Sequence, residues 1–179
     1  MSLKKFLTIN IFIIFALNFV SHFVYDLIPA NFLAIFFPVN ESIYEHQKMI
    51  FTSFLLTGFI DYFLMKKLKV EHNNFITNIL VTSIVCIASF LIIWLPVYYR
   101  IGENFILTII ILFVAICISQ IVAFYILSKD NNKLLNYISL AIIIIMVIVF
   151  AYFTFNPLYN EFFFDPMAEK YGINTYKIK

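Results

Sequence analysis

Five long apolar segments constrain the fold of this chain more than any other feature. They lie at residues 6–28, 49–65, 75–97, 105–127 and 134–155. The hydrocarbon core of a bilayer is about 30 Å thick and takes about 20 apolar residues to cross, in a helix that pairs its own backbone polar groups. Hydrophobic side chains make up 63% of the chain, and its mean hydropathy is +0.96. We therefore expect an all-α integral membrane protein with about five transmembrane helices, forming one domain over residues 1–179.

The composition and charge exclude several other classes of protein. The chain has only 3 glycines and 5 prolines, and its net charge of +2 reflects basic and acidic totals that nearly cancel. It therefore lacks the composition of collagen-like and low-complexity proteins and the basic surface of nucleic-acid-binding proteins. Cys86 and Cys117 both lie inside apolar segments, which argues against a disulfide framework or a cysteine metal site. No nucleic-acid partner is expected.

Charged residues in the short connecting segments predict the orientation. Seven basic residues fall at one end of the expected helices: Lys4, Lys5, Lys66, Lys67, Lys69, Lys129 and Lys133. Seven acidic residues fall at the other end: Asp26, Glu41, Glu45, Glu103, Glu161, Asp165 and Glu169. Positively charged connections generally stay in the cytoplasm. We therefore expect a multi-pass protein of the cell membrane with the N-terminus inside, the C-terminus outside and an acidic outer end.

Two outer segments do not fit a transmembrane helix. Residues 32–39 follow Pro29 and include Pro38, and they are too few to cross. They favour an interfacial or re-entrant segment followed by a helix that Asn40 caps and that begins at Glu41. Residues 156–179 form an outer tail that contains three consecutive phenylalanines at 162–164. We expect this tail to fold back over the outer mouth and to direct Asp165 at the polar residues there. A simple membrane-surface anchor is the alternative.

The densest polar cluster covers residues 40–48, at the start of the second expected helix. Glu41 and Glu45 share one helical face and His46 lies on the next, so two carboxylates and an imidazole fall within about two turns. These three residues are the candidates for acid–base catalysis, and they are also candidate ligands of a divalent metal. The alternative is a solvated amphipathic helix start, in which Lys48 pairs with Glu45 or with Tyr44.

A polar stripe on the first expected helix adds two candidate metal ligands. Asn18, His22 and Asp26 follow one another at helical spacing, and ionisable groups near hydrocarbon usually face the interior of a bundle. His22 and Asp26 would join Glu41, Glu45 and His46 as metal ligands. Alternatively, Asn18 only bridges helices and Asp26 lies in the wet interface.

Three further outer residues are candidates for substrate binding. Arg100 follows the aromatic end of the third expected helix, where it would neutralise Glu41 or Glu45 or hold a phosphate or carboxylate of a substrate. Asn40 and Asp165 belong to the acidic helix start and to the tail. Trp94 and Tyr98 are interpreted as interfacial anchors.

Three outer stretches of the sequence carry a resemblance: His22-Phe23-Val24-Tyr25, then Pro38-Val39 with the motif Asn-Glu-Ser-x-x-Glu-His-x-Lys at 40–48, and Asp165-Pro166 with Tyr171-Gly172-Ile173. With these residues the chain resembles an uncharacterised family of small multi-pass bacterial membrane proteins, a domain of unknown function. Family members tend to have tryptophan at the position of Tyr44 and a basic residue at the position of Phe164. Because Phe164 is not basic, a role of the tail in supplying positive charge to the outer site is weakened. The resemblance implies one recurring outer unit and names no activity.

Three hypotheses of function follow from the polar outer end. The first is an intramembrane hydrolase or transferase, metal-dependent in one version, that acts on a lipid-like substrate. The second is a subunit that binds or transports a small solute or a cation. The third is a structural or regulatory protein that docks a membrane partner protein. Membrane lipid, a second copy of the chain or another membrane protein are the partners that these hypotheses imply.

Overall fold

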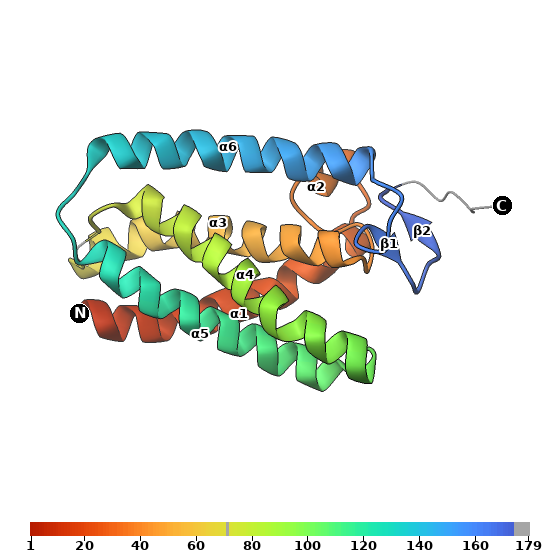
Figure 1. The fold of residues 1–179 in the computed structure, drawn as a ribbon. Helices are drawn as coiled ribbons and strands as arrows, with labels where there is room; N and C mark the ends of the chain where they lie inside the picture. The colour runs from red at the N-terminus through yellow and green to blue at the C-terminus, as the bar shows by residue number, and fades with distance from the viewer. Residues whose placement is uncertain (71, 174–179) are drawn as a thin grey trace.

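The computed structural model describes residues 1–70 and 72–173, and within them the chain forms a bundle of helices that ends in a small β-hairpin (Figure 1). The elements are α1 (Leu3–Leu27), α2 (Asn31–Ala34), α3 (Ile43–Leu68), α4 (Phe75–Ile101), α5 (Phe105–Leu127), α6 (Lys133–Phe155), β1 (Phe164–Asp165) and β2 (Lys170–Tyr171). All helices except α2 are long and apolar enough to cross a membrane. The expected all-α polytopic architecture is therefore confirmed, with a hairpin that was not expected.

The helix boundaries follow local capping and extend past the apolar segments. The Ser2, Asn104 and Asn132 side chains cap α1, α5 and α6 by accepting hydrogen bonds from backbone N–H groups of the first turn. The prediction that the second long helix begins at Glu41 with Asn40 as its cap is wrong. Helix α3 begins at Ile43, and the Ser42 hydroxyl accepts from the Glu45 N–H. The Asn40 carbonyl oxygen instead accepts from the Ser42 N–H.

Helix α3 is the central element of the bundle. Of its most apolar stretch, 61% is buried, against 33% or less in each of the other long helices. In Figure 1, α6 runs along one side of α3 and α1 lies on the other side. The main apolar core forms where α1, α3, α4 and α5 meet, around Ile14, Ile50, Cys86 and Ile116. The least hydrophobic long helix therefore lies inside, where neighbouring helices satisfy its polar groups.

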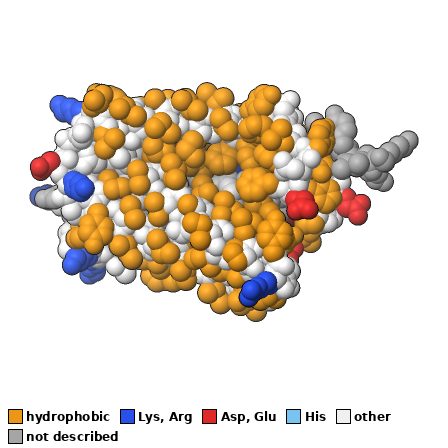
Figure 2. All heavy atoms as spheres, in the orientation of Figure 1, with side chains coloured by type: hydrophobic (Ala, Val, Ile, Leu, Met, Phe, Trp, Pro, Cys, Tyr) orange, Lys and Arg blue, Asp and Glu red, His pale blue; other side chains and the backbone are white. Residues whose placement is uncertain are grey.

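The surface around the sides of the bundle has the pattern expected of a membrane protein. Figure 2 shows hydrophobic side chains covering the middle of the molecule and charged side chains at its two ends. Exposed large apolar side chains lie on every long helix, for example Phe12, Phe59, Ile92, Ile121 and Ile148. Water would disfavour so large an apolar belt, whereas lipid chains match it. The orientation of the termini and the re-entrant character of α2 stay predictions.

The tail packs on the bundle at the end where α3 begins. Strand β1 pairs antiparallel with β2, Phe164 opposite Tyr171. The Tyr44 ring stacks on Phe163 at 4.4 Å between centroids, and the Tyr44 N–H donates to the Phe162 carbonyl at 2.9 Å. The tail therefore fixes the start of α3, which is where the candidate functional residues lie.

Replacing Gly172 with alanine is expected to weaken the docking of this hairpin. Gly172 has a φ of +53°, and a Cβ there would collide with the Thr154 carbonyl oxygen, which accepts from the Ile173 N–H. We expect a loss of about 2 kcal/mol in the free energy of unfolding, measured in detergent. Gly102→Ala measures the effect of backbone strain alone, because Gly102 has a φ of +81° and a ψ of −169° but open space around it. Unchanged stability of Gly172→Ala would contradict the close contact of Gly172 with Thr154.

Candidate functional site

Three side chains meet where α1 ends and α3 begins. His22 lies near the end of α1, Glu41 lies in the turn before α3, and His46 lies in the first turn of α3. The Glu41 Oε2 atom is 3.4 Å from His22 Nε2 and 3.4 Å from His46 Nε2. The imidazole centroids are 5.5 Å apart. Two histidines and one carboxylate therefore converge on a common point, and we call them the His–Glu–His cluster.

The turn that carries Glu41 is held by the tail. The Glu41 N–H donates to Asp165 Oδ2 at 3.1 Å, and Asp165 Oδ1 accepts from the N–H groups of Met167 and Ala168. The Asn40 amide donates to the Gly172 carbonyl at 2.9 Å. Asp165 therefore points toward the polar residues as expected, but it binds backbone atoms. Asn40 and Asp165 position Glu41 and do not line the space beside it.

Hydrogen bonding determines which nitrogen of His46 carries a proton. His46 Nδ1 lies 2.9 Å from the Ser42 carbonyl oxygen, which only accepts hydrogen bonds. In the neutral imidazole the proton is therefore on Nδ1, and the lone pair of Nε2 points at the Glu41 carboxylate. A lone pair facing a carboxylate oxygen is unfavourable unless a cation or a proton lies between them. Metal-ligating histidines commonly use this arrangement, with the second nitrogen bound to a carbonyl.

Two of the three ligand spacings in the cluster are compatible with the edge of a metal tetrahedron. Zinc binds imidazole nitrogen and carboxylate oxygen at about 2.0–2.2 Å, so two ligands of a tetrahedral ion lie about 3.3–3.5 Å apart. Both contacts to Glu41 Oε2 measure 3.4 Å. Direct N–H···O hydrogen bonds are usually shorter, about 2.7–3.2 Å. One ligand atom from each of the three residues lies within 4.8 Å of the others.

The charge state of Glu41 suits a metal ligand. Its contact with the His22 imidazole lowers the pKa of the Glu41 carboxyl below its ordinary value. Partial burial opposes this shift, and the charges of the two imidazoles in their protonated form add to it. Glu41 is therefore a carboxylate at neutral pH.

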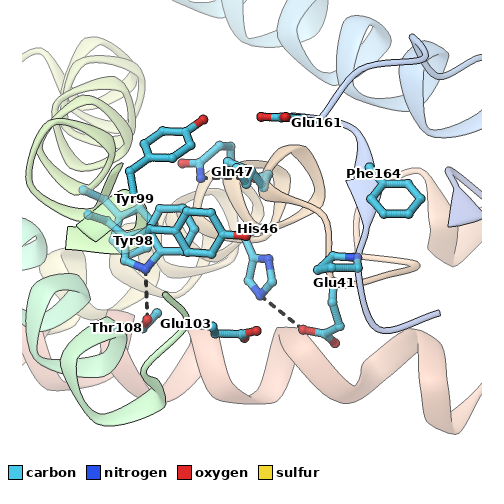
Figure 3. A pocket seen from close by; sticks show the side chains of 13 residues that line it. Glu41, His46, Gln47, Tyr98, Tyr99, Glu103, Thr108, Glu161 and Phe164 are labelled. Carbon is cyan, nitrogen blue, oxygen red and sulfur yellow. Dashed lines mark hydrogen bonds and ion pairs between the residues drawn. The ribbon is translucent and has the colours of Figure 1, made fainter. Parts of the chain in front are cut away.

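A cavity of about 330 Å³ opens beside the cluster. Glu41 and His46 line it together with an aromatic wall on α4, in which Trp94 stacks on Phe90 and on Tyr98. The Trp94 indole N–H donates to the Thr108 hydroxyl at 2.9 Å (Figure 3). The sequence did not predict this wall, because the residues that line the cavity with it come from α3, α5, the α4–α5 connection and the tail.

Two of the candidate residues lie away from the cluster. Asp26 is exposed one turn beyond His22, and Arg100 is exposed in the last turn of α4. Within residues 1–70 and 72–173, Arg100 forms no ion pair with Glu41 or Glu45 and does not line the cavity. The structure thus does not bring Asp26 or Arg100 together with His22, Glu41 and His46.

Glu45 lies in a separate, buried ion pair. Lys48 Nζ is 2.6 Å from Glu45 Oε2, and both side chains are 1% exposed. Lys48 Nζ also donates to the Ala34 carbonyl and to the Thr154 hydroxyl, at 2.8 and 2.7 Å. The Thr154 hydroxyl donates to Glu45 Oε1, and the Val39 N–H donates to Glu45 Oε2. All three ammonium protons are satisfied, so the Glu45–Lys48 pair ties α2, α3 and α6 together. Both Glu45 carboxylate oxygens accept hydrogen bonds within this network and are not free for a metal.

A second polar pair lies at the opposite end of the α1–α3 interface. The Asn10 amide donates to Asp61 Oδ2 at 2.7 Å, and both residues are buried. Asp61 Oδ1 and Asn10 Oδ1 have no hydrogen-bond partner in the described part of the chain. No role was predicted for Asp61 from the sequence. In the sequence, Ser53, Thr57 and Asp61 follow one another at steps of four. This polar face of one helix is the signal that would have identified Asp61.

The comparisons place the chain in a family. A family model described as "Family of unknown function (DUF6512)" matches residues 1–173. The chain belongs to the DUF6512 family. The match includes the whole His–Glu–His cluster and the hairpin that holds it, so the outer unit inferred from the resemblance is part of a DUF6512 domain. No curated protein and no solved structure matches the chain.

Proposed function

We propose that this protein is a membrane-embedded, metal-dependent hydrolase or transferase that acts on a lipid-like substrate. His22, Glu41 and His46 hold one divalent cation, with zinc the best match to the ligand set. The supporting observation is the pair of 3.4 Å contacts at Glu41 Oε2, one of them from His46 Nε2, while His46 Nδ1 lies 2.9 Å from the Ser42 carbonyl oxygen.

The ligand set supports a catalytic metal over a structural one. Two histidines and a glutamate occur in catalytic zinc sites, where the fourth position holds water or substrate. Here Glu41 and His46 border the cavity, so the fourth position would face it. His22, Glu41 and His46 would hold the ion, and the ion would supply Lewis acidity and a water of lowered pKa for hydrolysis of an ester or phosphoester group. In a transferase, an acceptor hydroxyl or amine replaces the water.

The aromatic wall supports a substrate with an apolar part. Phe90, Trp94 and Phe164 line the cavity, and its surroundings lie at the end of an apolar, lipid-facing bundle. A lipid-like molecule can place its chain against this wall and its polar group at the metal.

The experiment that tests this function is a lipid assay with and without metal. The protein is stripped with a chelator, reconstituted in nanodiscs of mixed phospholipids and given zinc, and the lipids are analysed by mass spectrometry. We expect a lipid product only in the zinc-loaded protein and its loss in His46→Ala. A product that forms equally in the stripped protein, or in zinc-loaded His46→Ala, would contradict the proposal.

The buried Asn10–Asp61 pair favours a second candidate, transport of a cation. A buried carboxylate with an unpartnered oxygen among transmembrane helices commonly marks an ion or proton pathway. Cation flux into proteoliposomes, lost in Asp61→Asn and retained in His46→Ala, would favour transport over hydrolysis. Flux that is absent from the wild-type protein would remove this candidate.

A further inference from the structure

The charges along the cavity have one sign. Three carboxylates line it, from Glu41, Glu103 and Glu161, whereas neither a lysine nor an arginine appears among its described lining residues. Glu41 belongs to the His–Glu–His cluster, where it contacts two imidazoles. Glu103 and Glu161 form no ion pair within residues 1–70 and 72–173. The cavity thus presents two uncompensated negative charges to a ligand.

A buried acceptor adds a second, independent observation. Gln47 lines the same cavity and is 3% exposed, and its Oε1 atom has no hydrogen-bond partner in the described part of the chain. Its Nε2 atom already donates to the Ile43 carbonyl at 3.2 Å, so the free atom is the acceptor. A buried acceptor without a donor costs free energy, which a ligand N–H group would recover. In Figure 3 the Gln47 amide and the Glu161 carboxylate lie on the Tyr99 side of the cavity.

We propose that the cavity binds the protonated primary amine of an amphiphilic molecule. The ammonium group donates hydrogen bonds to Gln47 Oε1 and Glu161, Glu103 adds to the negative potential, and the apolar chain lies along Phe90 and Trp94. The stacked Trp94 and Tyr98 rings add cation–π attraction. This inference deepens the proposed function, since it assigns a positive charge to the substrate. Arg100, one of whose predicted roles was to hold a phosphate or carboxylate of a substrate, does not line this cavity.

The single tryptophan of the chain supplies a direct readout. The sequence contains 1 Trp, and Trp94 lies in the cavity wall. Metal-free protein in a neutral maltoside detergent is titrated with dodecylamine, and Trp94 fluorescence is recorded. Dodecanoate, of opposite charge, and dodecyltrimethylammonium, which carries the charge without N–H donors, are the matched probes. We expect dodecylamine to bind at least about tenfold more tightly than either.

Charge-neutralising variants test the assigned residues. Glu103 and Glu161 are exposed, so Glu103→Gln/Glu161→Gln is expected to fold and to weaken dodecylamine binding about tenfold. Glu169→Gln, which removes an exposed tail charge outside the lining, should bind as the wild type does. Equal binding of the three probes, or unchanged dodecylamine binding in the double variant, would overturn the proposal.

Two arms separate the source of the amine and the role of the metal. The Trp94 fluorescence response to dodecylamine is compared in nanodiscs of phosphatidylethanolamine and of phosphatidylcholine. A weaker response in phosphatidylethanolamine means that the lipid headgroup amine competes for the cavity, and an equal response assigns the amine to a free amphiphile. The titration is repeated in His46→Ala. The amine titration uses metal-free protein, so its result does not depend on the metal site. If His46→Ala binds dodecylamine and a separate zinc titration shows no binding to the wild type, the metal site is rejected and the amine site is retained.

Discussion

Replacing His46 with alanine is expected to lower the affinity for zinc at least about 100-fold. The substitution removes one of three protein ligands and leaves Glu41 with a single imidazole at 3.4 Å, that of His22. Loss of a second-shell partner alone often costs about 10- to 100-fold in metal affinity, so loss of a ligand should cost no less. The affinity is measured by competition with a chromophoric chelator in detergent.

The third histidine of the chain is the matched control for this prediction. His72 follows α3 at the far end from the His–Glu–His cluster, and its Nδ1 atom lies 3.2 Å from the Val70 carbonyl oxygen. His72→Ala should bind zinc with wild-type affinity, whereas His22→Ala should behave as His46→Ala does. Equal affinities of His46→Ala and His72→Ala would show that zinc binds to surface groups and not to the cluster.

Replacing Lys48 with methionine is expected to destabilise the protein by about 3–5 kcal/mol. Both partners of the Lys48–Glu45 pair are 1% exposed, so removal of the ammonium leaves the Glu45 carboxylate buried with less compensation. The contacts of Lys48 to Ala34 and Thr154 are lost at the same time. The free energy of unfolding in detergent is compared between the two proteins.

A double-mutant cycle separates the buried pair from the general effect of losing a lysine. Glu45→Gln/Lys48→Met should lose less stability than the sum of the single variants, because each single substitution strands the other group. Lys67→Met is the control, since Lys67 is exposed on the same helix and should change stability by less than about 0.5 kcal/mol. Additive single effects would show that Glu45 and Lys48 do not depend on each other.

The spans were predictable from the sequence because hydropathy and length are local properties. The fifth segment was expected at 134–155, and α6 covers Lys133–Phe155. The start of α3 was misjudged because Asn40 and Ser42 are both good capping residues. The choice of Ser42 depends on Asn40 being held by the Gly172 carbonyl, 132 positions along the chain. The sequence alone contains no signal for that contact.

The candidate site was predictable in part. Glu41, His46 and His22 were grouped because helical spacing and the adjacency of consecutive helices place them together, and the structure brings these three into contact. Spacing also placed Glu45 beside Glu41 on one face. It could not show that α6 would bring Thr154 over that face and enclose Glu45 with Lys48. The pairing of Lys48 with Glu45 was among the alternatives, but its burial was not.

The metal content of the purified protein tests the central claim most directly. Wild-type protein and the triple variant His22→Ala/Glu41→Gln/His46→Ala are loaded with zinc, dialysed and analysed by elemental mass spectrometry. Helical content is checked by circular dichroism. We expect close to one zinc per chain in the wild type and almost none in the folded triple variant. A wild type without bound metal, or a triple variant that retains the same amount, would contradict a metal site formed by His22, Glu41 and His46.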